Sequence, residues 1–331
     1  SGGRISGSAN PSLGRTPKFD DTIRFWDVAT GKEIKRIAAG MPRGVVSAFV
    51  LAGGHSAYSP DGKTIVTPGE DQTARLWDVA TGEEIRRFEG HTATVGGAVF
   101  SPGGKTIITA SDDHTVRLWD VATGLEIQQF EGRTGPVTAA NLSPDGQTIV
   151  VSAGYPTTQR FDKIVRLWDV ATGAENYRLA GHTAGVTFAT FSPDGRSIIT
   201  TIETPDNTAR LWAATPKDKT RRLEGHRNPI RSVTVSPDTP TDTGGQTIAT
   251  ASEDKTVRLW DLNTGQEIAQ FAGHTGRVNA VAFSPNGQTV ASAGFDKVVR
   301  LRDIVTGEEI RRFEGHQGTI LSLAFSPDGQ T

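Results

Sequence analysis

The stretch Thr250–Asp261 reads TASEDKTVRLWD, and versions of it recur along the whole chain at a nearly constant interval. Within this stretch an Asp stands six residues before a Trp, as Asp254 and Trp260 show. Self-similarity at a period of about 20 to 50 residues is typical of folds built from stacked copies of one unit. The repeat that contains this stretch therefore decides the fold.

The interval between Asp and Trp counts the copies. It holds in six of them: Asp20 and Trp26, Asp71 and Trp77, Asp113 and Trp119, Asp162 and Trp168, Asp206 and Trp212, and Asp254 and Trp260. A seventh copy keeps Asp296 but has Arg302 in the place of Trp. The shortest spacing runs from position 77 to position 119, and we interpret longer spacings as insertions. Seven copies follow from this count.

Each copy has the pattern of short strands separated by turns. Apolar and polar residues alternate in Thr256–Trp260, Glu267–Phe271 and Arg277–Phe283, and Thr289–Ser292 is short and apolar. Turn sequences such as Ser-Pro-Asp-Gly and Ala-Thr-Gly stand between these runs. A four-stranded sheet with two apolar faces must stack on its neighbours. The pattern therefore predicts an all-β fold, a seven-bladed β-propeller with four-stranded antiparallel blades.

The two ends of the chain predict how the ring closes. The sequence stops after Ser-Pro-Asp-Gly-Gln-Thr at residues 326–331, where a second strand should begin, and residues 4–9 resemble that missing strand. We therefore expect residues 1–38 and 317–331 to form the closing blade together, within one propeller domain that covers residues 1–331. Pairing of strands from the two ends would remove the open edges of the sheet.

Composition and charge argue against several classes of partner and cofactor. The chain has 331 residues and a net charge of -2, with 35 Lys and Arg against 37 Asp and Glu, so no overall positive field gathers nucleic acid or an anionic membrane. No apolar run approaches the roughly 18 residues that span a bilayer. The chain has no Cys, no His pair at zinc spacing and no phosphate-binding glycine loop. We expect no metal and no cofactor.

A resemblance to a known family now becomes visible. Units of this length that run from Gly-His to Trp-Asp resemble WD40 repeats over essentially the whole chain. The block RLWDVATG recurs unchanged at Arg75–Gly82, Arg117–Gly124 and Arg166–Gly173. Such near-identity between copies is similar to prokaryotic WD40 arrays, which are often one part of larger kinases, NTPases or proteases.

The resemblance implies a non-catalytic scaffold that binds a partner protein or peptide. One alternative is a regulatory or sensory domain of a larger signalling protein such as a kinase or NTPase, and another is a hydrolase that uses the central channel. We expect a cytoplasmic protein, either alone or as part of a larger chain or complex. The first residue is Ser1 rather than Met, so a removed leader and an extracytoplasmic location stay open.

Two sets of polar residues invite interpretation as Ser/His/Asp hydrolase triads: His91, Ser111, Asp113 and Trp119; and His226, Ser252, Asp254 and Trp260. A third complete set of the same repeat positions is His182, Thr204, Asp206 and Trp212. A hydrolase triad would not be duplicated in successive repeats. The resemblance implies instead a buried chain of hydrogen bonds in which Asp accepts from the turn backbone and from His, and Ser bridges His to the indole N–H. We therefore expect no catalytic residue. Copies in which Gly40, Arg133 or Arg302 breaks the set should be less stable.

The resemblance also points to a binding face. In WD40 propellers the loops from the second to the third strand, and from the fourth strand to the next blade, lie on the top face, where Met41–His55 is an insertion. The residue before the turn Asp is aromatic in three copies. With nearby side chains, these residues form the predicted patch: Phe19, Phe161, Phe295, Tyr155, Arg160 and Arg277. Aromatic residues and Arg are favoured at interface hot spots. The alternative is that each Phe only packs under its own loop.

Overall fold

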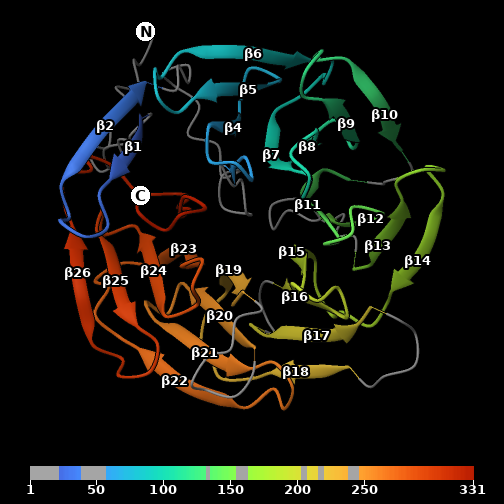
Figure 1. The fold of residues 1–331 in the computed structure, drawn as a ribbon. Helices are drawn as coiled ribbons and strands as arrows, with labels where there is room; N and C mark the ends of the chain where they lie inside the picture. The colour runs from blue at the N-terminus through green and yellow to red at the C-terminus, as the bar shows by residue number, and fades with distance from the viewer. Residues whose placement is uncertain are drawn as a thin grey trace, which may run out of the picture.

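The computed structural model of the chain describes residues 22–38, 57–131, 135–153, 163–202, 207–214, 220–237 and 246–331. Every helix or strand within these residues is a β-strand. Figure 1 shows the strands gathered into sheets that stand around a common centre. The chain therefore folds as the predicted all-β, seven-bladed propeller.

Six sheets of the described residues contain four antiparallel strands in chain order, and one contains two. The two-stranded sheet holds β1 (Thr22–Trp26) and β2 (Glu33–Ala38). The next three sheets hold β3 (Ala57–Tyr58), β4 (Thr64–Pro68), β5 (Thr73–Asp78) and β6 (Glu84–Glu89); β7 (Val95–Phe100), β8 (Thr106–Ser111), β9 (Val116–Asp120) and β10 (Glu126–Phe130); and β11 (Val137–Leu142), β12 (Thr148–Ala153), β13 (Val165–Asp169) and β14 (Glu175–Leu179).

The last three sheets follow in the same way around the ring. They hold β15 (Val186–Phe191), β16 (Ser197–Ile202), β17 (Ala209–Ala213) and β18 (Arg221–Leu223); β19 (Ile230–Val235), β20 (Thr247–Ser252), β21 (Val257–Asp261) and β22 (Glu267–Phe271); and β23 (Val278–Phe283), β24 (Thr289–Gly294), β25 (Val299–Asp303) and β26 (Glu309–Phe313).

The turn sequences close the strands by local hydrogen bonds. In Ser192-Pro-Asp194-Gly195 the Ser192 hydroxyl donates to the Asp194 carboxylate at 2.5 Å, and the backbone N–H of Gly195 donates to the Ser192 carbonyl oxygen at 2.9 Å. Gly195 has a φ of 69°, which glycine adopts without steric cost. This motif ends the first strand of a blade and begins the second.

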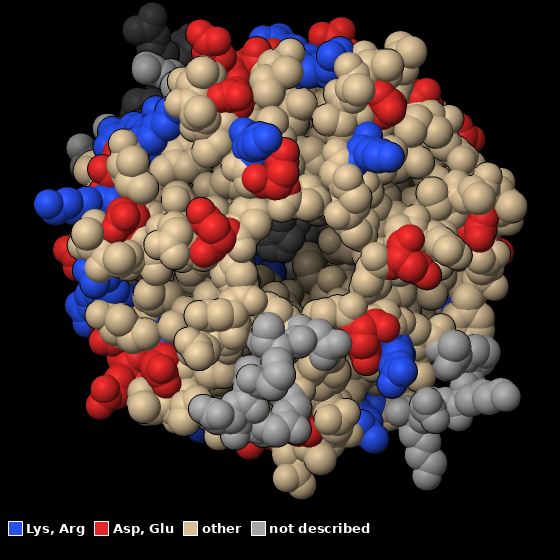
Figure 2. Space-filling model, in the orientation of Figure 1, with Lys and Arg blue, Asp and Glu red and all other residues tan. Residues whose placement is uncertain are grey.

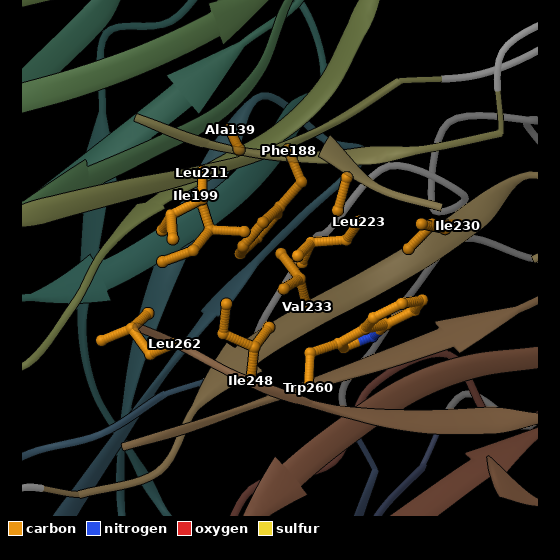
Figure 3. Packing of buried hydrophobic residues seen from close by; sticks show 11 residues of the cluster. Ala139, Phe188, Ile199, Leu211, Leu223, Ile230, Val233, Ile248, Trp260 and Leu262 are labelled. Carbon is orange, nitrogen blue, oxygen red and sulfur yellow. The ribbon is translucent and has the colours of Figure 1, made fainter. Parts of the chain in front are cut away.

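The hydrophobic core lies between neighbouring sheets. Figure 3 shows one cluster in which Phe188 and Leu211 of the β15–β18 sheet face Ile248 and Trp260 of the β19–β22 sheet. All four side chains are buried, and Trp260 is 1% exposed. Burial of a large apolar side chain contributes roughly 2 to 3 kcal/mol. Stacking of sheets thus stabilises the ring, as the repeat predicts.

Polar side chains also tie neighbouring blades together at the outer rim. The ammonium group of Lys35 on β2 donates to the carbonyl oxygen of Val79 in the next sheet at 2.9 Å. On β6, Arg86 donates to the carbonyl oxygens of Ala122 and Thr123, each at 2.8 Å. In both cases the third residue of an outer strand reaches the turn before the outer strand of the next blade. These bonds hold the blade spacing at the rim.

The carboxyl-terminal segment lies against the two-stranded sheet. The backbone N–H of Val28 donates to the carbonyl oxygen of Gln330 at 2.9 Å, as Val121 does to Lys105 in a four-stranded sheet. The rings of Trp26 and Phe313 are 6.0 Å apart, and Figure 1 places β1 and β2 beside the β23–β26 sheet. These contacts support a closing blade made from residues 1–38 and 317–331. Residues 1–21 lie outside the described residues, so this closure stays a prediction.

Candidate functional site

Four polar side chains of the β7–β10 sheet form one buried chain of hydrogen bonds. His91 Nδ1 lies 2.7 Å from Asp113 Oδ2, and His91 Nε2 lies 2.7 Å from the hydroxyl of Thr109. The indole N–H of Trp119 donates to the same hydroxyl at 2.8 Å. The β19–β22 sheet repeats this arrangement with each of these distances at 2.8 Å, through His226, Asp254, Thr250 and Trp260.

The hydroxyl that bridges His and Trp comes from a threonine two residues before the predicted serine, which corrects the prediction for Ser111 and Ser252. The pairing of β8 with β9 sets Thr109 opposite position 117 and therefore diagonal to Trp119, whereas Ser111 lies one step farther along the strand face. The Ser111 hydroxyl donates instead to the carbonyl oxygen of Ala93 at 3.2 Å. The serine closes the turn and the threonine joins His to Trp.

The third predicted set needs the same correction. The Thr200 hydroxyl lies 3.1 Å from His182 Nε2 and accepts from the indole N–H of Trp212 at 2.8 Å. Thr200 therefore holds the bridging place that the sequence suggested for Thr204. Thr204 and Asp206 themselves lie outside the described residues.

Other copies depart from this chain of hydrogen bonds, and two of them do so in different ways. Where Arg302 replaces Trp, its guanidinium donates to the carbonyl oxygen of Ala272 at 2.7 Å and lies over the ring of Phe271. In the β11–β14 sheet, Val151 stands at the threonine place, and the buried Nε1 of Trp168 has no hydrogen-bond partner among the residues that the structure describes. A missing acceptor for a buried N–H costs about 1 to 3 kcal/mol.

Burial and hydrogen bonding set the charges within the intact network. Burial alone would raise the pKa of Asp113, but hydrogen bonds from Thr115 and His91 outweigh it and hold this pKa at about 2. Burial lowers the pKa of His91 against the opposite effect of Asp113. Because His91 is 5% exposed and both ring nitrogens are engaged, it is not open to a substrate. The network supports the fold of the turn.

A different cluster lies at the surface, beside the turn between β24 and β25. Phe295 and Arg277, both predicted binding residues, come together here: the guanidinium carbon of Arg277 lies 5.4 Å from the centre of the Phe295 ring. The backbone N–H of Phe295 also donates to the Arg277 carbonyl oxygen at 2.9 Å. The other four predicted binding residues lie outside the described residues: Phe19, Phe161, Tyr155 and Arg160.

Gly294 makes this approach possible. A Cβ at this position would lie 2.1 Å from the carbonyl oxygen of Arg277, which is a backbone atom that cannot rotate away. Phe295 is consequently held at the end of β24 with 47% of its surface exposed. The side chain of Arg277 is 31% exposed. A rigid aromatic side chain and a guanidinium thus face solvent side by side.

Two further residues of the cluster were missed by the sequence analysis. The Nε of Arg231 donates to Glu253 Oε1 at 3.0 Å, and Arg277 Nη1 lies 3.7 Å from the same oxygen. Glu253 stands at the same repeat position as Phe295, directly before the turn Asp, and this position was the signal that could have found it. The cluster joins the β19–β22 and β23–β26 sheets.

Surface charge, metal ligands and membrane-spanning helices are other features of a structure that bear on function. Figure 2 shows one face of the ring with a hollow at its centre and with acidic and basic side chains interspersed around it. Among the residues that the structure describes, no group of three or more His, Asp or Glu is placed to hold a metal ion. The same residues form no helix long and apolar enough to cross a membrane.

The model of the WD domain, G-beta repeat family matches residues 51–78, 82–120, 124–169, 173–213, 217–261, 265–303 and 307–331. This chain belongs to the WD40 family. Its seven matched WD40 repeats agree with the count made from the Asp and Trp positions. WD40 proteins are generally non-enzymatic scaffolds.

Curated relatives match short parts of the WD40 chain. The guanine nucleotide-binding protein G(I)/G(S)/G(T) subunit beta-1 of Homarus americanus is 54% identical over 12% of this chain and 12% of its own length. The probable E3 ubiquitin ligase complex SCF subunit sconB of Arthroderma benhamiae is 52% identical over 12% of this chain and 6% of its own. The U3 snoRNP-associated protein-like YAO of Arabidopsis thaliana is 34% identical over 27% of this chain and 19% of its own.

The chain thus spans a fifth or less of the length of these relatives. All three come from eukaryotes, so they do not support the predicted likeness to prokaryotic arrays.

Proposed function

We propose that this WD40 chain is a non-catalytic platform that binds a partner protein or peptide on the face that carries Phe295 and Arg277. The observation that carries the proposal is the exposure of Phe295 beside a guanidinium, with both residues fixed at strand ends. Aromatic residues and Arg are enriched in the few positions that supply most of an interface's binding energy. A site that is already ordered loses little entropy when a partner binds.

The names of the relatives support this proposal. They describe a subunit of a guanine nucleotide-binding protein, a subunit of a ubiquitin ligase complex and a protein associated with a snoRNP. Each name places a protein with WD40-like sequence in an assembly. A cytoplasmic location and membership of a larger chain or complex would fit this function, and both stay predictions.

The test is selection from a random peptide library displayed on phage, with the whole chain immobilised. We expect peptides that bind the native chain and fail to bind Phe295→Asp. Leu125→Asp is the matched control, because Leu125 is 69% exposed but lies in the turn between β9 and β10, at the other end of the strands. Both variants should melt cooperatively near the native temperature.

Equal retention of peptides by the native chain and Phe295→Asp would move the binding surface away from this face. Failure to retain any peptide above a bare surface would contradict the platform itself.

A further inference from the structure

The guanidinium of Arg277 has N–H donors that neighbouring residues do not bind. The inference drawn from this observation extends the proposed function and rests on it. The guanidinium of Arg231 already binds Glu253 through Nε at 3.0 Å and through Nη2. Arg277 Nη1 lies 3.7 Å from the same carboxylate oxygen, which is longer than a hydrogen bond. The Nε of Arg277 is buried and has no hydrogen-bond partner among the described residues.

The charge around Arg277 is also incompletely compensated. Burial lowers the pKa of Arg277, and the neighbouring Arg231 lowers it further, while Glu253 acts in the opposite direction. An Arg stays protonated under all ordinary conditions. The guanidinium therefore remains charged in an environment that an additional carboxylate would improve.

The same end of the strands is electrostatically uneven around the ring. Lys255 and Lys297 lie exposed in the turns of the two sheets that hold the cluster, and Arg227 lies exposed in the loop before β19. The aspartates of these turns, Asp254 and Asp296, are held by histidines. At the position directly after the turn Asp, where these two lysines stand, the β3–β6 and β7–β10 sheets have Gln72 and His114, and the β11–β14 sheet has the exposed Lys163. Two of the three lysines at this position in the described turns therefore lie in the two sheets that hold the cluster.

We propose that Arg277 and Phe295 bind an acidic peptide segment of a partner protein. A Glu or Asp carboxylate of the segment accepts hydrogen bonds from the guanidinium of Arg277, whose planar fork matches a carboxylate. An apolar side chain next to that acid packs on the ring of Phe295. The site is one compact cluster beside Glu253, whereas a polynucleotide needs a positively charged groove that follows its backbone.

The first measurement is the composition of the peptides that the library yields. We expect the native chain to retain peptides with Asp or Glu beside an apolar residue, and Arg277→Met to lose this enrichment. Methionine keeps an unbranched apolar side chain at the position over Phe295, and Glu253 keeps its partner Arg231, so the variant should fold.

The second measurement is the affinity of one retained acidic peptide, labelled with fluorescein and followed by anisotropy. Arg277→Met should bind it about tenfold or more weakly, because a hydrogen bond to a charged group is lost. Glu253→Gln should bind it about threefold more tightly, because a competing negative charge is removed. Arg87→Met is the matched control on the outer strand, with an Arg that is 49% exposed, and should change nothing.

The outcomes separate this inference from the proposed function. Peptides that require Phe295 but show no acidic enrichment would overturn the acidic partner and leave the binding platform in place. Peptides that require neither residue, or no retained peptide, would overturn both. Weaker binding by Glu253→Gln would also contradict the carboxylate model. Binding of a phosphoserine peptide or an oligouridine through Arg277, with none by the Glu peptide, would assign the site to phosphate.

Discussion

Replacing Thr109 by Val should destabilise the propeller much more than the similar size and shape of the two side chains suggest. Thr109 is fully buried, and its hydroxyl contacts His91 Nε2 and the indole N–H of Trp119. Valine has nearly the same shape, so packing is kept. The substitution removes the shared hydrogen-bond partner and leaves two buried polar groups unpaired.

The size of this effect follows from those two groups. An unsatisfied buried donor or acceptor costs about 1 to 3 kcal/mol. Two such groups, with some relaxation of the His91 ring, should lower the free energy of unfolding by about 3 kcal/mol. Thr109→Ser keeps the hydroxyl and loses one methyl group, so it should cost only about 1 kcal/mol.

The assay is urea unfolding followed by tryptophan fluorescence, with the unfolding free energies of the native chain and both variants compared. A double-mutant cycle with Trp119→Phe, which removes the indole N–H, should show that Thr109→Val costs about 1 kcal/mol less in that background. If Thr109→Val and Thr109→Ser prove equally stable, or if the cycle is additive, the assignment of the bridging hydroxyl to Thr109 is wrong.

Gly294→Ala should lower the unfolding free energy by about 3 kcal/mol or more, because the new Cβ would overlap the backbone of Arg277. The control is Gly96→Ala, whose Cβ has no neighbour within 4 Å. In the same urea assay its unfolding free energy should stay within about 0.5 kcal/mol of the native value. Stability should also fall in acid. Asp113 has a folded pKa of about 2 against an ordinary 3.8, so its stabilisation, about 2 kcal/mol, is complete above about pH 4 and lost as the pH falls through about 2. The lowered pKa of His91 adds a loss that begins below about pH 6.5. Thermal melts from pH 7 to pH 2 should show a shallower decline for Asp113→Asn, and parallel curves would contradict this account.

The sequence predicted the fold well because the repeat fixes the period, the strand alternation and the turns together. The runs Glu267–Phe271 and Thr289–Ser292 are strands, and the second extends to Gly294. The identity of the bridging hydroxyl was harder to predict, because Thr109 and Ser111 share one strand face and only the register of β8 against β9 separates them. The repeat position of Glu253 was visible in the sequence, but its contact with Arg231 depends on the register of β19 against β20.

The candidate site lies at a position of the repeat where the copies differ. In two copies the residue two places before the turn Asp is a serine, Ser111 or Ser252, whose hydroxyl bonds the backbone of the preceding loop. In the copy with Phe295 this residue is Gly294, as it is Gly69 in the β3–β6 sheet, and at Gly294 the backbone itself approaches Arg277 where a side chain would clash. The turn Asp, Asp296, still binds His274 at 2.8 Å, so the turn keeps its anchor. The anchor of the turn thus does not depend on the residue between Gly294 and Asp296, and the exposed ring of Phe295 at that place is the feature on which the proposed binding function rests.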